Sequence, residues 1–208
     1  AYYDDDAGSA SGSAYVFLAP RTSSWPQVAK MAASDAAASD EFGSSVAIDG
    51  DTVVVGSPLD DDVPNNSGSA YVFHTSDGGA TYGQVAKLTA SDAAWMDYFG
   101  ISVAIDGGTV VIGAQHYNNG GSGVVYVFRT TDGGATYGQV AKLTAADAAV
   151  NDRFGYSVAI AGDTVVVGTY SKEAVYVFLT TDGGATYAQV AKLTASDGAA
   201  NDSFGGSV

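Results

Sequence analysis

Carboxylates are the side chains through which this sequence has the most scope for chemistry. Its 208 residues include 23 Asp and Glu against 8 Lys and Arg. Two runs of three aspartates, Asp4 to Asp6 and Asp60 to Asp62, stand in segments rich in Gly, Ser, Asn and Pro. Clustered carboxylates suit a hard cation such as calcium, which takes roughly 6 to 8 oxygen ligands. Solvated acidic loops are the alternative interpretation, because runs of like charge are usually exposed.

A second set of aspartates comes in pairs with constant spacing, one pair in each of four similar segments. The pairs are Asp35 and Asp40, Asp92 and Asp97, Asp147 and Asp152, and Asp197 and Asp202. Because the pair recurs in every copy, we expect it to cap a turn that all copies share. Metal binding is the alternative. The residues that would then hold calcium are Asp60, Asp61, Asp62, Asp92 and Asp97.

Side chains for catalysis are few and occupy unrelated positions. His74 and His116 stand at non-equivalent places in the repeats, and no Ser-His-Asp arrangement recurs. The arginines, which are Arg21, Arg129 and Arg153, are equally scattered. The absence of cysteine excludes thiol catalysis and zinc–thiolate sites. We therefore expect that the protein is not an enzyme.

Charge and hydropathy exclude two classes of partner. The formal net charge is −15, whereas nucleic-acid binding relies on Lys and Arg to neutralise phosphates. The longest apolar runs, such as residues 124–128, are far shorter than the roughly 20 residues of a membrane helix. We expect neither nucleic-acid binding nor insertion into a membrane.

The elements that carry these side chains are repeated. Residues 42–56 read FGSSVAIDGDTVVVG, similar segments occupy 99–113 and 154–168, and another begins at Phe204. Each contains two short apolar runs rich in β-branched residues, joined by a turn such as Asp49-Gly50, which predicts strand, tight turn and strand. The second run is apolar at consecutive positions, so that strand should be covered on both faces.

Two further strand-like segments complete each repeat. GSAYVF at 12–17 returns at 68–73, with shorter relatives at 124–128 and 174–178, and predicts a third strand. QVAK, first at residues 27–30, mixes polar and apolar residues and predicts an outer fourth strand. Its lysines should protect an exposed edge from pairing with other chains, and they are Lys30, Lys87, Lys142 and Lys192.

The connection between the third and fourth strands follows the pattern S/T-x-D-x-G-x-T-aromatic, which resembles the Asp-box hairpin of sialidases. It occurs at 75–82, 130–137 and 180–187, and Arg21 to Trp25 departs from it. An aspartate in such a turn can accept backbone N–H bonds while the following glycines take positive φ. We interpret the three aspartates as structural, and they are Asp77, Asp132 and Asp182.

Four strands per repeat predict an all-β fold, a β-propeller of four-stranded antiparallel blades. Alanine-rich stretches such as 32–38 are expected to be loops. Residues 1–208 form one predicted repeat domain, with blades at 1–41 (partial), 42–98, 99–153, 154–203 and a further start at 204–208. Because the first blade lacks its first two strands, we expect these repeats to belong to a larger propeller, completed by other repeats or by another chain.

The order FG-x-SVAIDGDTVVVG, acidic loop, GSAYVF, QVAKLTASDAA and the next FG resembles the FG-GAP repeat, related to the integrin α-subunit head. The resemblance implies a propeller that serves in adhesion or recognition outside the cell or at its surface. Integrin-type repeats often carry a calcium loop D-x-D-x-D-G between the first two strands. The turn Asp49-Gly50-Asp51 is too short to supply those ligands.

The loops between the second and third strands differ most among the repeats, and in a blade they lie on the same face as the connectors to the next blade. Binding sites on repeat scaffolds usually use variable loops on a uniform frame, and unconstrained drift is the alternative. The expected ligand-binding residues are Asp60, Asp61, Asp62, Asn65, Gln115, His116, Tyr117, Asn118, Tyr170 and Lys172. We expect extracellular recognition, adhesion or a structural role, with a protein or glycan as partner. A sialidase-type glycosidase is the alternative.

Overall fold

The computed structural model describes residues 1–18, 24–61, 66–115, 121–198 and 202–208. These residues form fourteen β-strands in four antiparallel sheets and no helix, which confirms the predicted all-β fold. Within the same ranges there is no helix that could span a lipid bilayer.

Each sheet is built from strands that follow one another in the chain. The first sheet contains β1 (Ala14–Phe17) and β2 (Gln27–Met31). The second contains β3 (Ser45–Asp49), β4 (Thr52–Ser57), β5 (Ser69–His74) and β6 (Gly83–Leu88). The third contains β7 (Phe99–Asp106), β8 (Thr109–Ala114), β9 (Val124–Arg129) and β10 (Gly138–Leu143). The fourth contains β11 (Phe154–Ala161), β12 (Thr164–Thr169), β13 (Val175–Leu179) and β14 (Ala188–Leu193).

The two middle strands of each complete sheet, the second and the third, are the most buried ones. In β4, Val54 lies opposite Ala47 of β3 and Val72 of β5, and it has no exposed surface. Val53 and Val55 on the other face are buried too. The fourth strand lies at the edge of each sheet and alternates exposed with half-buried residues, as in β6. Both features agree with the sequence prediction, because only a strand covered on both faces can be apolar at successive positions.

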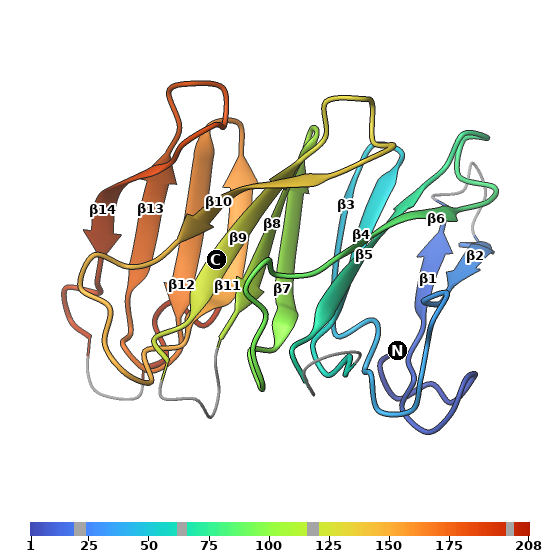
Figure 1. The fold of residues 1–208 in the computed structure, drawn as a ribbon, viewed down its shortest axis with the longest axis horizontal. Helices are drawn as coiled ribbons and strands as arrows, with labels where there is room; N and C mark the ends of the chain where they lie inside the picture. The colour runs from blue at the N-terminus through green and yellow to red at the C-terminus, as the bar shows by residue number, and fades with distance from the viewer. Residues whose placement is uncertain (19–23, 62–65, 116–120, 199–201) are drawn as a thin grey trace.

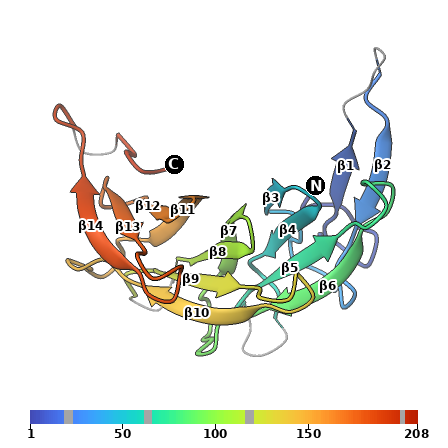
Figure 2. The same cartoon turned by 90° about the horizontal axis from the view of Figure 1, so that it is seen from above.

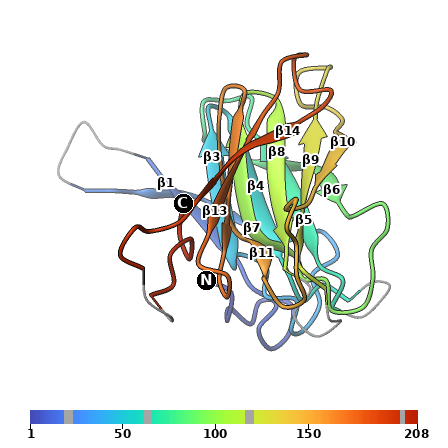
Figure 3. The same ribbon diagram turned by 90° about the vertical axis from the view of Figure 1, so that its left-hand side faces the viewer.

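The sheets are arranged side by side in an open arc (Figure 1 and Figure 2). The first strand of each complete sheet lies on the inner side of the arc and the fourth on the outer side (Figure 2). The hairpin β1–β2 and the sheet β11–β14 are the two ends of the arc and lie far apart. Seen from the side, β1 and β2 project away from the three complete sheets (Figure 3). The sheets are thus blades, each stacked on its neighbour.

Glycines at the blade junctions allow the backbones of neighbouring blades to approach closely. A Cβ atom on Gly56 would lie 2.0 Å from the carbonyl oxygen of Gly100 in the next blade, where only hydrogen fits. Ser45 Oγ donates a hydrogen bond to the same carbonyl at 2.7 Å. The contact recurs between Ser102 and Gly155, and between Ser157 and Gly205. The F-G-x-S pattern therefore encodes the junction between one blade and the next.

The phenylalanine that opens each repeat anchors the blade internally. Phe42 is fully buried, with ring centroids 5.5 Å from Tyr71 and 5.9 Å from Phe73 of β5. Phe99 and Phe154 make the same pair of contacts at the same centroid distances. Aromatic pairs in this range contribute about 0.5 to 1.5 kcal/mol beyond the area that they bury.

Candidate functional site

One end of the blades carries the short hairpins, and their turns use the aspartates that the sequence interpreted as structural. Asp77 Oδ1 accepts backbone N–H bonds from Ala80 and Thr81, both at 2.9 Å, and a bond from Thr75 Oγ1 at 2.7 Å. These donors, Thr81 foremost, hold the pKa of Asp77 well below its usual range. Asp132 and Asp182 are bonded in the same way. The hairpin end is therefore uniform across the three complete blades.

The opposite end carries the loops in which the sequence places the ligand. Here the loop between the second and third strands is tied to the connector that leads into the next blade. Phe99 N donates to the carbonyl of Ser67 at 2.9 Å, and Phe154 N donates to that of Ser122 at 2.8 Å. The two kinds of segment thus lie on one face, as predicted, and we call it the loop face. Its frame repeats although its loop sequences differ.

Beneath the loop face, a tyrosine, a lysine and an aspartate form a cluster in each complete blade. Tyr126 Oη donates to Asp92 at 2.9 Å, and Lys142 Nζ lies 2.5 Å from the same carboxylate and 5.5 Å from the centre of the Tyr126 ring. The lysine ammonium, with the tyrosine hydroxyl, lowers the pKa of Asp92, while burial and the carboxylate raise the pKa of Tyr126. The equivalent clusters are Tyr71, Lys87 and Asp35, and Tyr176, Lys192 and Asp147. Each cluster ties an incoming connector to the third and fourth strands.

In three of the four pairs of aspartates, the two members have different roles. The second member caps a turn, as the sequence predicts: Asp40 Oδ2 accepts the N–H of Ala37 at 2.7 Å, and Asp97 and Asp152 do the same for Ala94 and Ala149. The first member instead bonds the tyrosine and lysine of the cluster. The sequence predicted that the lysines of the fourth strands protect an exposed edge. In the structure they also form ion pairs with the first aspartate of each pair.

Asp40 is the one carboxylate in the described residues whose pKa is raised to about 6. Its side chain is almost fully buried, and Asp60 and Asp61 add negative charge nearby. Its Oδ1 has no hydrogen-bond partner among the described residues. Burial favours the protonated acid, and the positive charge of Lys87 only partly offsets it.

The expected ligand-binding residues have different surroundings. Asp60 is buried and accepts a bond from Tyr71 Oη at 2.5 Å, with Lys87 Nζ at 3.0 Å. Asp61 is exposed, and Gln115 is buried. Lys172 pairs with Asp152 at 2.7 Å. Five of the expected residues lie outside the described ranges, namely Asp62, Asn65, His116, Tyr117 and Asn118.

The loop face carries an aromatic group of which the sequence predicted only one member, Tyr170. The ring centroids of Tyr170 and Tyr156 are 4.9 Å apart, and the Arg153 guanidinium lies 5.3 Å from the centre of the Tyr170 ring. Tyr170 is 42% exposed. The only signal in the sequence is Tyr156, which stands where Ser44 and Ile101 stand in the other F-G-x-S segments. We call these three residues the Tyr–Arg platform.

Two arginines that an enzyme of sialidase type would bring together lie at opposite ends of the blades. Arg153 belongs to the loop face, whereas Arg129 donates to the carbonyl of Gly183 in a hairpin of the other end. Arg21 lies outside the described residues. A hollow beside Arg129 also includes Asp106, but its carboxylate accepts the N–H of Gly162 at 2.5 Å.

No metal-binding group stands out in the ranges that the structure describes. Within them, no three His, Cys, Asp or Glu residues are grouped so that they could hold an ion. Asp60 and Asp92 already have lysine and tyrosine partners. Calcium at the acidic loops stays a prediction.

Four-stranded blades with a repeated junction define a module of the β-propeller type. The family model for the FG-GAP repeat matches residues 25–73, 82–128, 137–188 and 187–208. The chain therefore belongs to the FG-GAP repeat family, as its sequence resemblance predicts. A search of curated proteins found none that matches it.

Proposed function

We propose that the chain is an extracellular recognition module, located on or outside the cell, that binds a protein or a glycan through the loop face. Membership of the FG-GAP repeat family supports this role, because such repeats build β-propeller modules that often serve in adhesion or recognition. The second support is the contrast between the two ends of the blades. The hairpin end repeats the same turns, whereas the loop end varies on a constant frame.

The observation that carries the proposal is the Tyr–Arg platform. Tyrosine and arginine are enriched in binding interfaces, because they offer a large flat surface with a polar or charged tip. Tyr170 presents a ring to solvent next to a guanidinium, which suits the apolar face of a sugar ring or a flat polar side chain of a protein. Contact with the tilted ring of Tyr156 holds that ring in place before a ligand arrives.

A glycosidase is the competing function. It would need acids with perturbed pKa in one pocket, or several arginines around a substrate carboxylate. Arg129 and Arg153 lie at opposite ends of the blades, which argues against the second arrangement. Asp40 has a raised pKa, yet its side chain is almost fully buried under the loop face and out of reach of a sugar.

Binding arrays with a parallel activity assay separate the two functions. The chain is applied to immobilised glycans and to extracellular proteins, and the same glycans are incubated with it to detect hydrolysis. We expect saturable binding to a protein or glycan without hydrolysis. Hydrolysis without stable binding would contradict the proposed recognition role and favour a glycosidase function.

A further inference from the structure

We propose that the Tyr–Arg platform binds a sugar whose ring carries a carboxylate, an assignment that rests on the proposed recognition role of the loop face and names its class of ligand. Uronic and sialic acid residues of glycans have this chemistry. Tyr170 contacts the sugar ring, and Arg153 binds the carboxylate and so selects acidic sugars over neutral ones.

The platform stands on a short loop that is closed by its own hydrogen bonds. Thr169 N donates to the carbonyl of Ala174 at 3.0 Å, which ties the end of β12 to the start of β13. Ser171 N donates to the carbonyl of Asp152 at 3.4 Å, which ties the loop to the connector that carries Arg153. The ring of Tyr170 and the Arg153 guanidinium are therefore held side by side without a ligand.

Arg153 occupies a position whose side chain differs in every connector. The equivalent residues are Glu41, Tyr98 and Ser203, and all four have positive φ between 54° and 58°. The frame thus sets a backbone conformation that favours glycine, yet each copy has a side chain there, of different charge and size. A position of this kind can adapt to a ligand without a change of fold.

The charges around the platform are balanced, although the net charge of the chain is −15. Lys172 pairs with Asp152 at 2.7 Å, and Lys192 pairs with Asp147 at 2.7 Å. The same loop carries one further acid and the platform one further cation, namely Glu173 and Arg153. An anionic ligand therefore meets no excess of negative charge at this place.

The loop face of the second blade is more acidic. There Lys87 pairs with both Asp35 and Asp60, at 2.7 Å and 3.0 Å. The exposed Asp61 follows Asp60 directly, and Glu41 stands where the later connector has Arg153. Repulsion at this end and balance at the other favour the platform as the place where an acid binds.

A carboxylated sugar matches both parts of the platform at once. A guanidinium carries its N–H donors in a fork that fits the two oxygens of a carboxylate. An aromatic ring suits the apolar face of a pyranose. In a uronic or sialic acid the carboxylate is attached to the sugar ring itself, so one residue of the glycan reaches Arg153 and Tyr170 together. An acidic peptide side chain offers the carboxylate without the ring.

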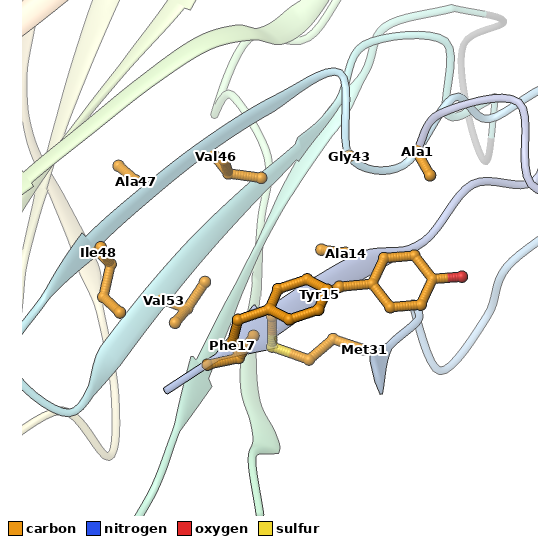
Figure 4. Close-up of a pocket in the computed structure, with 11 residues that line it drawn as sticks. Ala1, Ala14, Tyr15, Phe17, Met31, Gly43, Val46, Ala47, Ile48 and Val53 are labelled. Carbon is orange, nitrogen blue, oxygen red and sulfur yellow. The ribbon is translucent and has the colours of Figure 1, made fainter. Parts of the chain in front are cut away.

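The hollows elsewhere on the described part of the chain suit such a ligand less well. None of the side chains that line the hollow between β1 and β3 carries a charge, and most are apolar (Figure 4). The hollow at the hairpin end includes Arg129, but Asp106 and Asp163 border it and would repel an acid.

Two matched pairs of probes test the class of ligand by calorimetry with the whole 208-residue chain. The first pair is trigalacturonate and its methyl ester, which differ in charge but not in the sugar rings. The second is sialyllactose and lactose. We expect at least one acid to bind saturably and at least roughly tenfold more tightly than its neutral partner, as a charge-assisted hydrogen bond would give.

The outcomes separate this assignment from the proposed function. Absence of binding by both acids, or equal binding of acid and neutral partner, would overturn the assignment. A neutral glycan or a protein that binds through Tyr170 would overturn it too, while the recognition role of the loop face would stand. A hexa-aspartate peptide that binds as tightly as the acidic sugars would show that the platform does not select a sugar.

Arg153→Asn and a matched variant locate the acid. Asparagine tolerates positive φ, so this variant should fold, and its melting temperature checks that it does. Arg129→Asn removes the same charge at the hairpin end. We expect Arg153→Asn to lower the ratio of acid to neutral affinity to about one, and Arg129→Asn to leave the ratio unchanged. Equal weakening of acid and neutral probe in Arg153→Asn, or equal effects of the two variants, would contradict the assignment.

Discussion

At the scale of single residues, the fold disfavours the ionised form of the Asp40 carboxyl group. Its pKa is raised to about 6, above the ordinary value of 3.8, by burial and by the nearby Asp60 and Asp61. The folded state therefore binds a proton more tightly than the unfolded state. Any stability that this proton contributes is present at low pH and is lost as the pH rises from about 4 through 6.

Asp40→Asn should remove this pH dependence. An asparagine can keep the bond from Ala37 N while carrying no charge. We expect the variant to be more stable than the wild type above pH 6 by about 1 to 3 kcal/mol, since one pKa unit corresponds to roughly 1.4 kcal/mol. The difference should shrink below pH 4, and urea unfolding across this range measures it.

Asp152→Asn is the matched control for Asp40→Asn, because Asp152 caps the equivalent turn and pairs with Lys172 at 2.7 Å. Its loss of charge should destabilise the protein at pH 7. A stabilising effect at Asp152, or none at Asp40, would refute the conclusion that the fold disfavours the ionised form of Asp40.

The acidic loops give a second prediction at this scale. If Asp60 to Asp62 or the carboxylates of Asp92 and Asp97 hold calcium, excess chelator should lower the melting temperature, because an ion held only by the folded state stabilises it. Differential scanning fluorimetry with and without chelator measures the effect, and added calcium should restore it. An unchanged melting curve would remove the metal from these loops.

At the scale of the elements, the close approach of backbones at the blade junctions predicts which glycines are essential. In Gly113→Ala the new Cβ would lie 2.0 Å from the carbonyl oxygen of Gly155 and 2.3 Å from Ser102 Oγ. We expect a loss of at least about 2 kcal/mol in the free energy of unfolding, because backbone must move to relieve the clash.

Gly138→Ala serves as the control for Gly113→Ala, since no atom lies within 4 Å of its added Cβ. It should change the free energy of unfolding by less than about 0.5 kcal/mol. Similar effects at the two positions would mean that the blades are not packed through this contact.

Most of the elements follow from the sequence, because four copies in register mark the strands and the turns independently. The consecutive valines of β4 predicted a strand covered on both faces, and Asp77 predicted the turn of its hairpin. The tyrosine–lysine clusters did not follow, since Tyr126 and Asp92 are far apart in the chain and meet only when blades stack. For the same reason the sequence identified Tyr170 but neither of its partners in the platform.

At the scale of the whole molecule, the blades form an arc whose two ends lie apart (Figure 2). The sequence predicted β1 and β2 as a third and a fourth strand, and the structure pairs them as one antiparallel sheet beside the second sheet (Figure 2). Met31 of β2 belongs to the same apolar cluster as Val55 of β4 and Tyr71 of β5, and this packing holds the hairpin β1–β2 against the second sheet.

The claim that the loop face is the recognition surface is tested most directly by two variants on the same binding array. Tyr170→Ala removes the exposed ring of the platform, and Val190→Ala trims a side chain of similar exposure on the outer strand β14. We predict that Tyr170→Ala loses at least roughly tenfold in affinity for the protein or glycan that the wild type binds, while Val190→Ala keeps it. Unchanged affinity of Tyr170→Ala, together with a loss in Val190→Ala, would place the ligand on another surface and contradict the account.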